Sequence, residues 1–334
     1  MADTITRRRA ICIMAATAGL PLIPFVGPAL AAADPVVWRG QALGAPATLI
    51  LNHPDRAKAE ALVRRVVAEV ERLESIFSLY RDDSSLRELN RVGALAAPPP
   101  ELVTLLERCD EFWAASGRKF DPTVQPLWVL FARHFATRGA DPRGPSRQEI
   151  DAVASLVSFD AVKFNRDRVV FSRPGMALTF NGIAQGFVTD RIVDLLRQEG
   201  ITSSLVNLGE SRAIGARADG TPWRIGLSET EDGATIDEMA ALVDKAVSTS
   251  SPFGFHFDPA LHFSHLIDPR LGSIEPLYRR LSVIAPDAVT ADALSTAFTL
   301  TALSQVRSFV QASSDISVDL MTIQGEHMRL GPAS

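Results

Sequence analysis

The sequence predicts an α+β fold in which mixed or antiparallel sheets carry flanking helices. Candidate strands outnumber candidate helices, and several strands follow one another without a helix between them, which does not suit a regular strand-helix alternation. No internal repeat or low-complexity run interrupts the chain. The residues beyond the N-terminal segment are also numerous enough to bury a substantial common core.

Residues 1–33 predict an export signal that is not part of the fold. Arg7-Arg8-Arg9 precedes an apolar segment from Ala10 to about Val26, and Ala31-Ala32-Ala33 offers a small-residue cleavage site. The apolar segment is shorter than the ~20 residues of a membrane-spanning helix. Paired arginines favour the twin-arginine route to the periplasm, and a general Sec signal is the alternative. The folded part is then expected at residues 34–334.

Charge and cysteine content exclude some classes of function. The chain has 34 Lys and Arg against 39 Asp and Glu, and residues 1–33 hold three of the arginines and one aspartate. The remainder is therefore clearly acidic and offers no electrostatic footprint for nucleic acid or anionic lipid. Cys109, the only cysteine after residue 33, lies on the apolar face of a predicted helix and is expected in the core.

Periodicity predicts the individual elements. Apolar residues at steps of three or four predict a helix over residues 55–77, and Ser146 with Glu149 forms a capping box that opens a short helix. A helix is expected from just after Gly186 to Gly200, and another from about Ala291. The polar residues 137–145 predict a surface insertion. Strands are expected at Val36–Trp38, Ala47–Leu51, Ala161–Phe164, Arg168–Phe171, Met176–Phe180, Ser204–Leu208, Trp223–Leu227, Ala246–Ser250, His262–Ile267 and Leu281–Ala285.

The stretch Met176–Asp190 is the most informative part of the chain. An apolar run ends in Asn181-Gly182, and Ala184 and Gly186 follow before a helix begins. Small residues at such a turn let the backbone approach a ligand closely, and the helix N-terminus beyond favours an anion such as a phosphate. The alternative is a tight turn that needs glycine for steric reasons alone.

A second stretch, residues 290–297, pairs a carboxylate with a hydroxyl. Thr290 is predicted to cap a helix, and Asp292 then falls in the first turn, where the helix dipole favours an anion. Capping alone would account for Asp292. Thr296, however, is four residues on and shares its helical face. One carboxylate and one hydroxyl, completed by carbonyls, waters and phosphate oxygens, suit a hard cation such as Mg²⁺.

Three histidines, His256, His262 and His265, stand within ten residues. If residues 261–267 form a strand, His265 shares a face with apolar neighbours while His262 points the other way, so the two cannot bind one zinc ion. His265 is better placed as a general base. A hydrogen-bonded core histidine is the alternative.

Two further polar stretches have purely structural explanations when each is considered alone. Tyr80 and the turn Ser84–Asn90 crowd a helix exit, where Tyr80 could stack on a flat ring, although a capped helix-turn-helix explains the pattern equally. Asp121 precedes Pro122 after a glycine turn and is a turn former unless a ligand lies nearby.

Together these stretches resemble the FAD:protein FMN transferase family, known as ApbE, in the family's own order and over most of the chain from about Trp38. The matching segments are Phe77-Ser-Leu-Tyr with Ser84 and Leu89-Asn90, Gly117 with Phe120-Asp-Pro-Thr123, Asn181-Gly-Ile-Ala-Gln-Gly186 with Asp190-Arg191, Val206-Asn-Leu-Gly209, His265-Leu-Ile-Asp-Pro-Arg270 with Gly272, and Asp292-Ala-Leu-Ser-Thr296. The resemblance implies that residues 34–334 form a transferase domain of that fold.

The resemblance also implies a reaction and roles for the residues. Such enzymes split FAD and attach FMN through a phosphoester to a threonine of another exported protein, and AMP leaves. Mg²⁺ would be held by Asp292, Thr296 and the backbone carbonyl of Ala184, and His265 would take the proton from the acceptor threonine. The FAD site would comprise Tyr80, Ser84, Asn90, Asp121, Thr123, Gly182, Gln185, Gly186, Gly209 and Asp268.

The chain departs from the family pattern at several positions. Gln185 stands where members usually carry lysine, Glu210 and Ser211 replace a usual glycine and aspartate, and Asn181 and Ser251 each replace a glycine. Loss of a lysine removes a point charge for phosphate. The pattern around Gln185 and Glu210 is similar to the NosX subgroup of nitrous oxide respiration, which implies a NosR-like membrane flavoprotein as acceptor. A flavin carrier without catalysis and an FAD pyrophosphatase without an acceptor are the alternatives.

Overall fold

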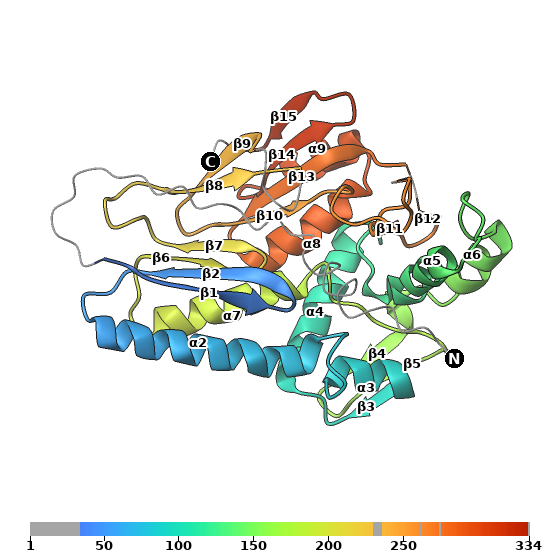
Figure 1. Ribbon diagram of the computed structural model, residues 1–334, viewed down its shortest axis with the longest axis horizontal. Coiled ribbons are helices and arrows are strands. Elements are labelled where there is room, and N and C mark those ends of the chain that lie inside the picture. Colours follow the sequence, from blue (N-terminus) through green and yellow to red (C-terminus); the bar gives the residue numbers. More distant parts are fainter. Residues whose placement is uncertain (1–33, 230–235, 261, 274, 333–334) are drawn as a thin grey trace.

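The computed structural model describes residues 34–229, 236–260, 262–273 and 275–332. The predicted export signal at residues 1–33 lies outside the described residues. The central element is a sheet in the order β1-β2-β6-β7-β10-β13-β14-β15, in which each neighbouring pair is antiparallel (Figure 1). Its strands are β1 (Val36–Ala42), β2 (Ala45–Leu51), β6 (Ser204–Asn207), β7 (Ser211–Ile214), β10 (Ala246–Ser250), β13 (Tyr278–Ala285), β14 (Ser317–Thr322) and β15 (His327–Leu330).

Helices flank this sheet, and three smaller sheets lie around it. The helices are α2 (Arg56–Phe77), α3 (Ser85–Val92), α4 (Pro100–Ala115), α5 (Gln125–Ala136), α6 (Arg147–Ala154), α7 (Ala184–Gln198), α8 (Ala288–Thr299) and α9 (Leu303–Gln311), with short 3-10 helices at Pro122–Val124 and Phe159–Ala161. The smaller sheets join β3 (Ala94–Ala96), β5 (Arg168–Phe171) and β4 (Val162–Phe164); β8 (Trp223–Leu227) and β9 (Glu238–Leu242); and β11 (Ile267–Asp268) and β12 (Gly272–Ser273). The predicted α+β class is confirmed.

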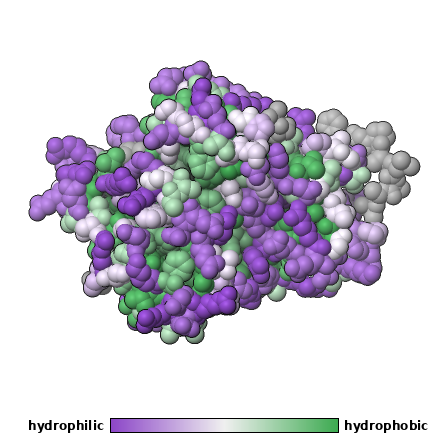
Figure 2. Space-filling model, turned by 180° about the vertical axis from the view of Figure 1, so that it is seen from behind, coloured by the Kyte–Doolittle hydropathy of each residue, from purple (hydrophilic) through white to green (hydrophobic). Residues whose placement is uncertain are grey.

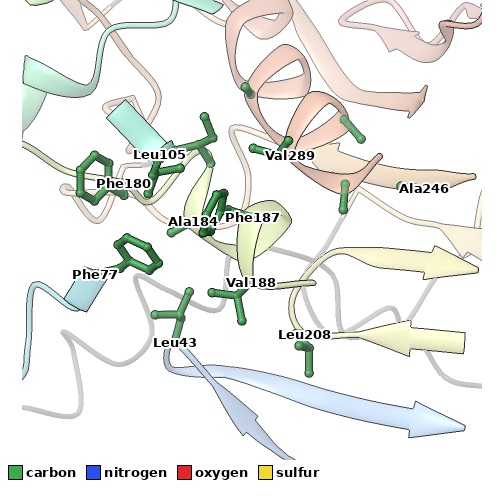
Figure 3. Packing of buried hydrophobic residues seen from close by; sticks show 14 of the residues in the cluster. Leu43, Phe77, Leu105, Phe180, Ala184, Phe187, Val188, Leu208, Ala246 and Val289 are labelled. Carbon is green, nitrogen blue, oxygen red and sulfur yellow. The ribbon is translucent and has the colours of Figure 1, made fainter. Parts of the chain in front are cut away.

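The main core lies between the large sheet and helices α2, α7 and α8. Helix α2 buries the apolar stripe that its periodicity predicts, which ends at Phe77. There the Phe77 ring meets Phe180 and Phe187 edge to face, with ring centroids 6.0 and 5.5 Å apart (Figure 3). Cys109 of α4 is fully buried in the same core, as expected.

The hairpin β8–β9 covers the opposite face of the sheet (Figure 1). Trp223, Ile225 and Leu227 of this hairpin pack with Leu205 of β6 and Val247 of β10 in a second, smaller core. Both faces of the sheet are therefore buried over its central strands. This explains why β6 and β10 lack the strict alternation of a half-exposed strand.

A third apolar cluster stands apart from both cores. Helices α5 and α6 with residues 255–260 and 262–267 form what we call the aromatic lobe. Its centre is Leu127, Phe131 and Ile267, and Trp128 and Phe257 pack around it. The rings of Trp128 and Phe257 meet edge to face at 5.3 Å. The lobe carries one wall of the candidate site.

Helices α7 and α8 cap each other at their N-terminal ends. Asp190 of α7 accepts the amides of Ala288 and Val289, both at 2.8 Å, and Asp292 of α8 accepts the amide of Gly186 at 2.9 Å. These amides are among those that have no partner within their own helix. A side chain at Gly186 would lie 2.3 Å from the Ala288 oxygen, so glycine is required where the two helices cross.

Two predicted strands and one predicted cap are wrong. Residues 176–180 run extended without a strand partner, because their apolar side chains enter the core and the Asn90 side chain bonds both backbone groups of Leu178. Within residues 262–267, only Ile267 belongs to a strand; the Asp258 carboxylate instead holds the backbone amides of residues 262 and 263 in a turn. The helix predicted from about residue 291 begins at Ala288, with Asp287 as its N-cap in place of Thr290.

The surface is largely polar on the face shown in Figure 2, where apolar residues form small separate groups. Among the residues that the structure describes, we find no helix that is both long enough and apolar enough to cross a bilayer.

We expect Gly186→Ala to lower the free energy of unfolding by about 1–3 kcal/mol, because the added methyl group would force α7 and α8 apart. Urea denaturation followed by circular dichroism measures the change. Gln198→Ala, at the exposed end of α7, is the control and should have little effect. A Gly186→Ala variant as stable as the wild type would show that the helix crossing is not tight.

Candidate active site

A cleft opens where the start of α7, the helix α8 and the aromatic lobe meet. Its lining includes Asp121, Gly182, Ala184, Gln185, His265, Asp292 and Thr296. Seven side chains or backbone positions that the sequence singled out thus meet in one cavity.

The turn at residues 181–183 brings the start of α7 to the cleft. The Phe180 carbonyl accepts the amides of Ile183 and Ala184 at 3.0 and 2.8 Å, which closes the turn. A methyl group at Gly182 would lie 2.8 Å from Thr296 Oγ1, so this turn and α8 are in close contact. The predicted close approach of backbone is therefore made to α8 itself, beside the cleft.

Asp292 and Thr296 lie one turn apart on the face of α8 that meets the cleft. Asp292 is only 2% exposed, and burial raises the pKa of its carboxyl to about 7. Asp292 does not cap its own helix, since Asp287 and Asp190 cap α8. Its bond to the Gly186 amide instead aims the carboxylate at the start of α7.

Glu210 places a second buried carboxyl group next to Asp292. The residue is 2% exposed, and its Oε1 atom has no hydrogen-bond partner among the described residues, although the Ser248 side chain lies beside the carboxyl group. Burial and then the charge of Asp292 raise the pKa of Glu210 well above its usual range. The neighbouring Arg212 does not neutralise this pair because it is bonded to Asp190. Two acidic groups in one dry site favour a cation or a proton between them.

His265 reaches the cleft from the aromatic lobe. Its Nδ1 atom lies 3.1 Å from the Phe255 carbonyl, so Nδ1 carries the proton and Nε2 is left as the acceptor. Burial lowers the pKa of His265 to about 4, and the ring is neutral at pH 7. The side chain of His262 is 70% exposed and lies beside Asp258. The two rings therefore do not face one site.

Asp121 lines the cleft but has its oxygens committed to the protein. Oδ1 accepts from the amide and hydroxyl of Thr123 at 2.8 and 2.5 Å, and Oδ2 accepts from the Trp113 indole and the Phe159 amide at 3.0 and 3.2 Å. The carboxylate thus shapes this wall by holding three segments together. Thr123 is buried behind it.

Gln185 and Gly209 pack against each other behind the α7 turn. Gly209 has a φ of +103°, and a side chain there would lie 2.5 Å from the Gln185 amide group. Gly209 therefore leaves the space that the Gln185 side chain fills. Gln185 faces the cleft, whereas Gly186 and Gly209 support it from behind.

Seven of the ten residues predicted at FAD lie outside the cleft lining: Thr123, Gly186, Gly209 and Asp268, and three residues that follow α2 in the chain. Ser84 is a fully buried N-cap of α3, and Asn90 bonds the backbone of Leu178. Tyr80 is 38% exposed and approaches the side chain of Asn181, at the edge of the turn. The roles predicted for all three at the flavin nucleotide stay predictions.

The cleft also contains residues that the sequence did not single out, among them Lys119, Trp128 and Leu43. Lys119 Nζ bonds Asp268, which lies behind the lining, at 2.6 Å. Trp128 presents an aromatic ring from α5. In the sequence, the only indication of a role for Lys119 is its position next to the Phe120-Asp-Pro-Thr123 motif.

The chemistry of the donors is that of a hard-cation site. Within the described ranges, no three His, Cys, Asp or Glu side chains gather into one cluster, so a cation here would depend on hydroxyl and carbonyl oxygens as well. The available donors near the α7 turn are the Asp292 carboxylate, the Thr296 hydroxyl and backbone carbonyls, all oxygen atoms. A neutral imidazole in the same cleft adds a proton acceptor.

Comparison with known proteins gives one consistent result. The ApbE family model matches residues 43–320. The FAD:protein FMN transferase of Vibrio cholerae is 25% identical over 254 residues, which cover 74% of this chain and 75% of that protein. The enzyme of the same name from Escherichia coli K12 is 23% identical and covers 89% and 87%. The crystal structure of the flavinyl transferase ApbE of Pseudomonas stutzeri superposes with a TM-score of 0.76 at 26% identity, over 91% of this chain and 97% of that one.

We expect Glu210→Gln to stabilise the protein at pH 8 in the presence of EDTA. The folded pKa values of Glu210 and Asp292 are raised above their unfolded values, so the pair favours folding at low pH and loses this contribution as the pH rises through about 7. Removing one carboxyl group should therefore add on the order of 1–2 kcal/mol to the free energy of unfolding at pH 8. At pH 5 it should add much less.

Urea denaturation at both pH values measures this difference, with Asp194→Asn on the exposed side of α7 as the control. An equal effect of Glu210→Gln at pH 5 and pH 8 would contradict a charged pair at this site.

Proposed function

The chain belongs to the ApbE family, and we propose that it is an FAD:protein FMN transferase whose reaction takes place in the cleft between α7, α8 and the aromatic lobe. Relatives of that name match most of the chain. The observation that carries the proposal is the meeting of His265 with Asp292 and Thr296 in one cavity. A fold alone would not fix the activity, but this arrangement supplies the groups that the reaction needs.

The substrates are FAD and a threonine hydroxyl of an acceptor protein. The hydroxyl oxygen attacks the phosphorus of the FMN half, a new P–O bond forms, and the phosphoanhydride bond to AMP breaks. His265 Nε2 takes the hydroxyl proton, because its lone pair is free while Nδ1 donates to Phe255. AMP leaves with the bonding electrons. The low pKa of His265 keeps the base neutral and ready throughout the neutral pH range.

The residues of the cleft fit Mg²⁺ as the cofactor. Asp292, Thr296 and the Ala184 carbonyl are oxygen donors that line the same cavity. The carboxyl group of Glu210, whose Oε1 has no partner among the described residues, adds a second acidic group behind them. When bound, Mg²⁺ would neutralise the charge of the pyrophosphate. Thr296 Oγ1 is fixed for this role by its packing against Gly182.

The site of action and the acceptor are further parts of the proposal. The arginines and apolar segment of residues 1–33 support export to the periplasm by the twin-arginine route. The acceptor would then be an exported or membrane flavoprotein that carries a modified threonine. The similarity of Gln185 and Glu210 to the NosX subgroup supports a NosR-like protein as this partner. The acidic chain supports no nucleic acid partner.

We expect His265→Ala to abolish FMN transfer while FAD still binds. The assay combines the mature protein, FAD, Mg²⁺ and a NosR-like flavin domain, and follows covalent flavin by in-gel fluorescence and by the mass of the acceptor. Loss of a general base should lower the rate by about 100-fold or more. His262→Ala is the matched control, since this ring is exposed and lies nearby.

Transfer that persists in His265→Ala would overturn the assigned base. Bound FAD with no transfer by the wild type to any threonine-bearing acceptor would favour a flavin carrier. Release of free FMN and AMP without labelled acceptor would favour a pyrophosphatase.

Removal of divalent cations by EDTA is expected to stop transfer, and Mg²⁺ should restore it. Asp292→Asn and Thr296→Val should each weaken Mn²⁺ binding, measured by calorimetry, by roughly 10- to 100-fold. Thr299→Val is the control, because its hydroxyl bonds the Thr296 carbonyl within α8. Unchanged Mn²⁺ affinity in Asp292→Asn would remove this residue from the cation site.

A further inference from the structure

Lys119 is the one lysine or arginine among the described residues that line the cleft. The other charged or chargeable side chains there are Asp121, Asp292 and His265, and His265 is neutral at pH 7. The turn of residues 181–186 contributes no positive side chain. An anionic ligand that enters this cleft therefore meets a single fixed positive charge from the protein.

A built support holds the Lys119 ammonium in place. Its Nζ atom lies 2.6 Å from Asp268 Oδ2, and the Asp268 side chain is 1% exposed. The other oxygen of Asp268 accepts the amides of Arg270 and Leu271 at 2.9 and 3.0 Å. The backbone turn after Asp268 thus holds the Asp268 carboxylate in place, and the carboxylate positions the Lys119 ammonium group. The structure thus assigns to Asp268 the role of positioning the Lys119 side chain.

The loop before Lys119 separates it from its basic neighbour. Arg118 has a φ of +70° and lays its guanidinium over the Trp113 ring, 4.7 Å from the centroid. The Phe120 amide bonds Ser116 Oγ at 3.0 Å, which closes the loop on the other side. Arg118 therefore turns away onto α4, and Lys119 turns toward the cleft.

The ammonium group keeps donors for a ligand. A lysine has three N–H groups, and Asp268 takes one of them. The side chain is 32% exposed and lines the cleft, which leaves the remaining donors available to a ligand there. Because Asp268 already restricts the lysine, a ligand need not supply the entropy of ordering this long side chain.

We propose that Lys119, held by Asp268, binds the phosphate oxygens of the flavin nucleotide in this cleft. The inference rests on the proposed function for the identity of the nucleotide, but not on catalysis. It assigns to this loop a phosphate contact that is separate from Asp292 and Thr296. A purely structural ion pair between the loop and the β11–β12 hairpin would not distinguish ligands that carry phosphate from ligands that lack it.

The test compares flavins with and without phosphate, in EDTA, so that no turnover is needed. Dissociation constants for FAD, FMN and riboflavin are measured by the change in flavin fluorescence. We expect Lys119→Gln to weaken FAD and FMN by roughly tenfold or more and to leave riboflavin within about twofold. Lys119→Arg should restore most of the affinity for FAD and FMN. Arg118→Gln is the matched control.

Lys119→Gln leaves the Asp268 carboxylate buried without its cation, so the double variant Lys119→Gln/Asp268→Asn is measured beside it. The same selective loss of FAD and FMN affinity is expected there. Equal weakening of riboflavin and FAD, or unchanged FAD affinity, would overturn the proposal while the transferase function stands. A wild-type protein that binds no flavin either in EDTA or with Mg²⁺ restored would overturn both.

Discussion

The mutual capping of α7 and α8 is the constraint on which the candidate site depends. Each helix lends an aspartate to the first turn of the other, Asp190 in one direction and Asp292 in the other. Their crossing admits only glycine at residue 186. Because Asp292, which faces the cleft, also caps α7, the position of its carboxylate is fixed by the same bonds that hold the core helices together.

This arrangement buries two groups of like charge near the cleft, which lowers the stability of the folded protein. Asp292 and Glu210 are both buried and lie close together, while the nearby Arg212 forms its salt bridge with Asp190. Buried groups of like charge oppose folding unless a proton or a cation joins them. The two buried carboxyl groups thus lower the stability of the protein at a place where a bound divalent ion would raise it, as is common at functional sites.

The sequence predicts those features that depend on interactions between residues close together in the chain. The helix periodicity of residues 55–77 and the shared face of Asp292 and Thr296 are confirmed, because both follow from the geometry of one helix. The sequence predicts a strand at residues 176–180, because an apolar run does not reveal that a distant side chain, Asn90, satisfies the backbone groups of Leu178. Asp287, not Thr290, caps α8, and no local pattern shows that Asp190 assists it. Lys119, which lines the cleft, is held by Asp268, 149 residues away in the chain, and no local pattern reveals such a partner.

The separate packing of the aromatic lobe has a consequence for cooperativity. His265 belongs to a segment that packs on α5 and α6, whereas Asp292 and Thr296 are built on the main core. Regions with their own small core can open without global unfolding. Opening of the lobe would move His265 away from Asp292 and Thr296 on α8 while the sheet stays intact. If the reaction needs these residues together, as we propose, heating should abolish activity at a lower temperature than that of global unfolding.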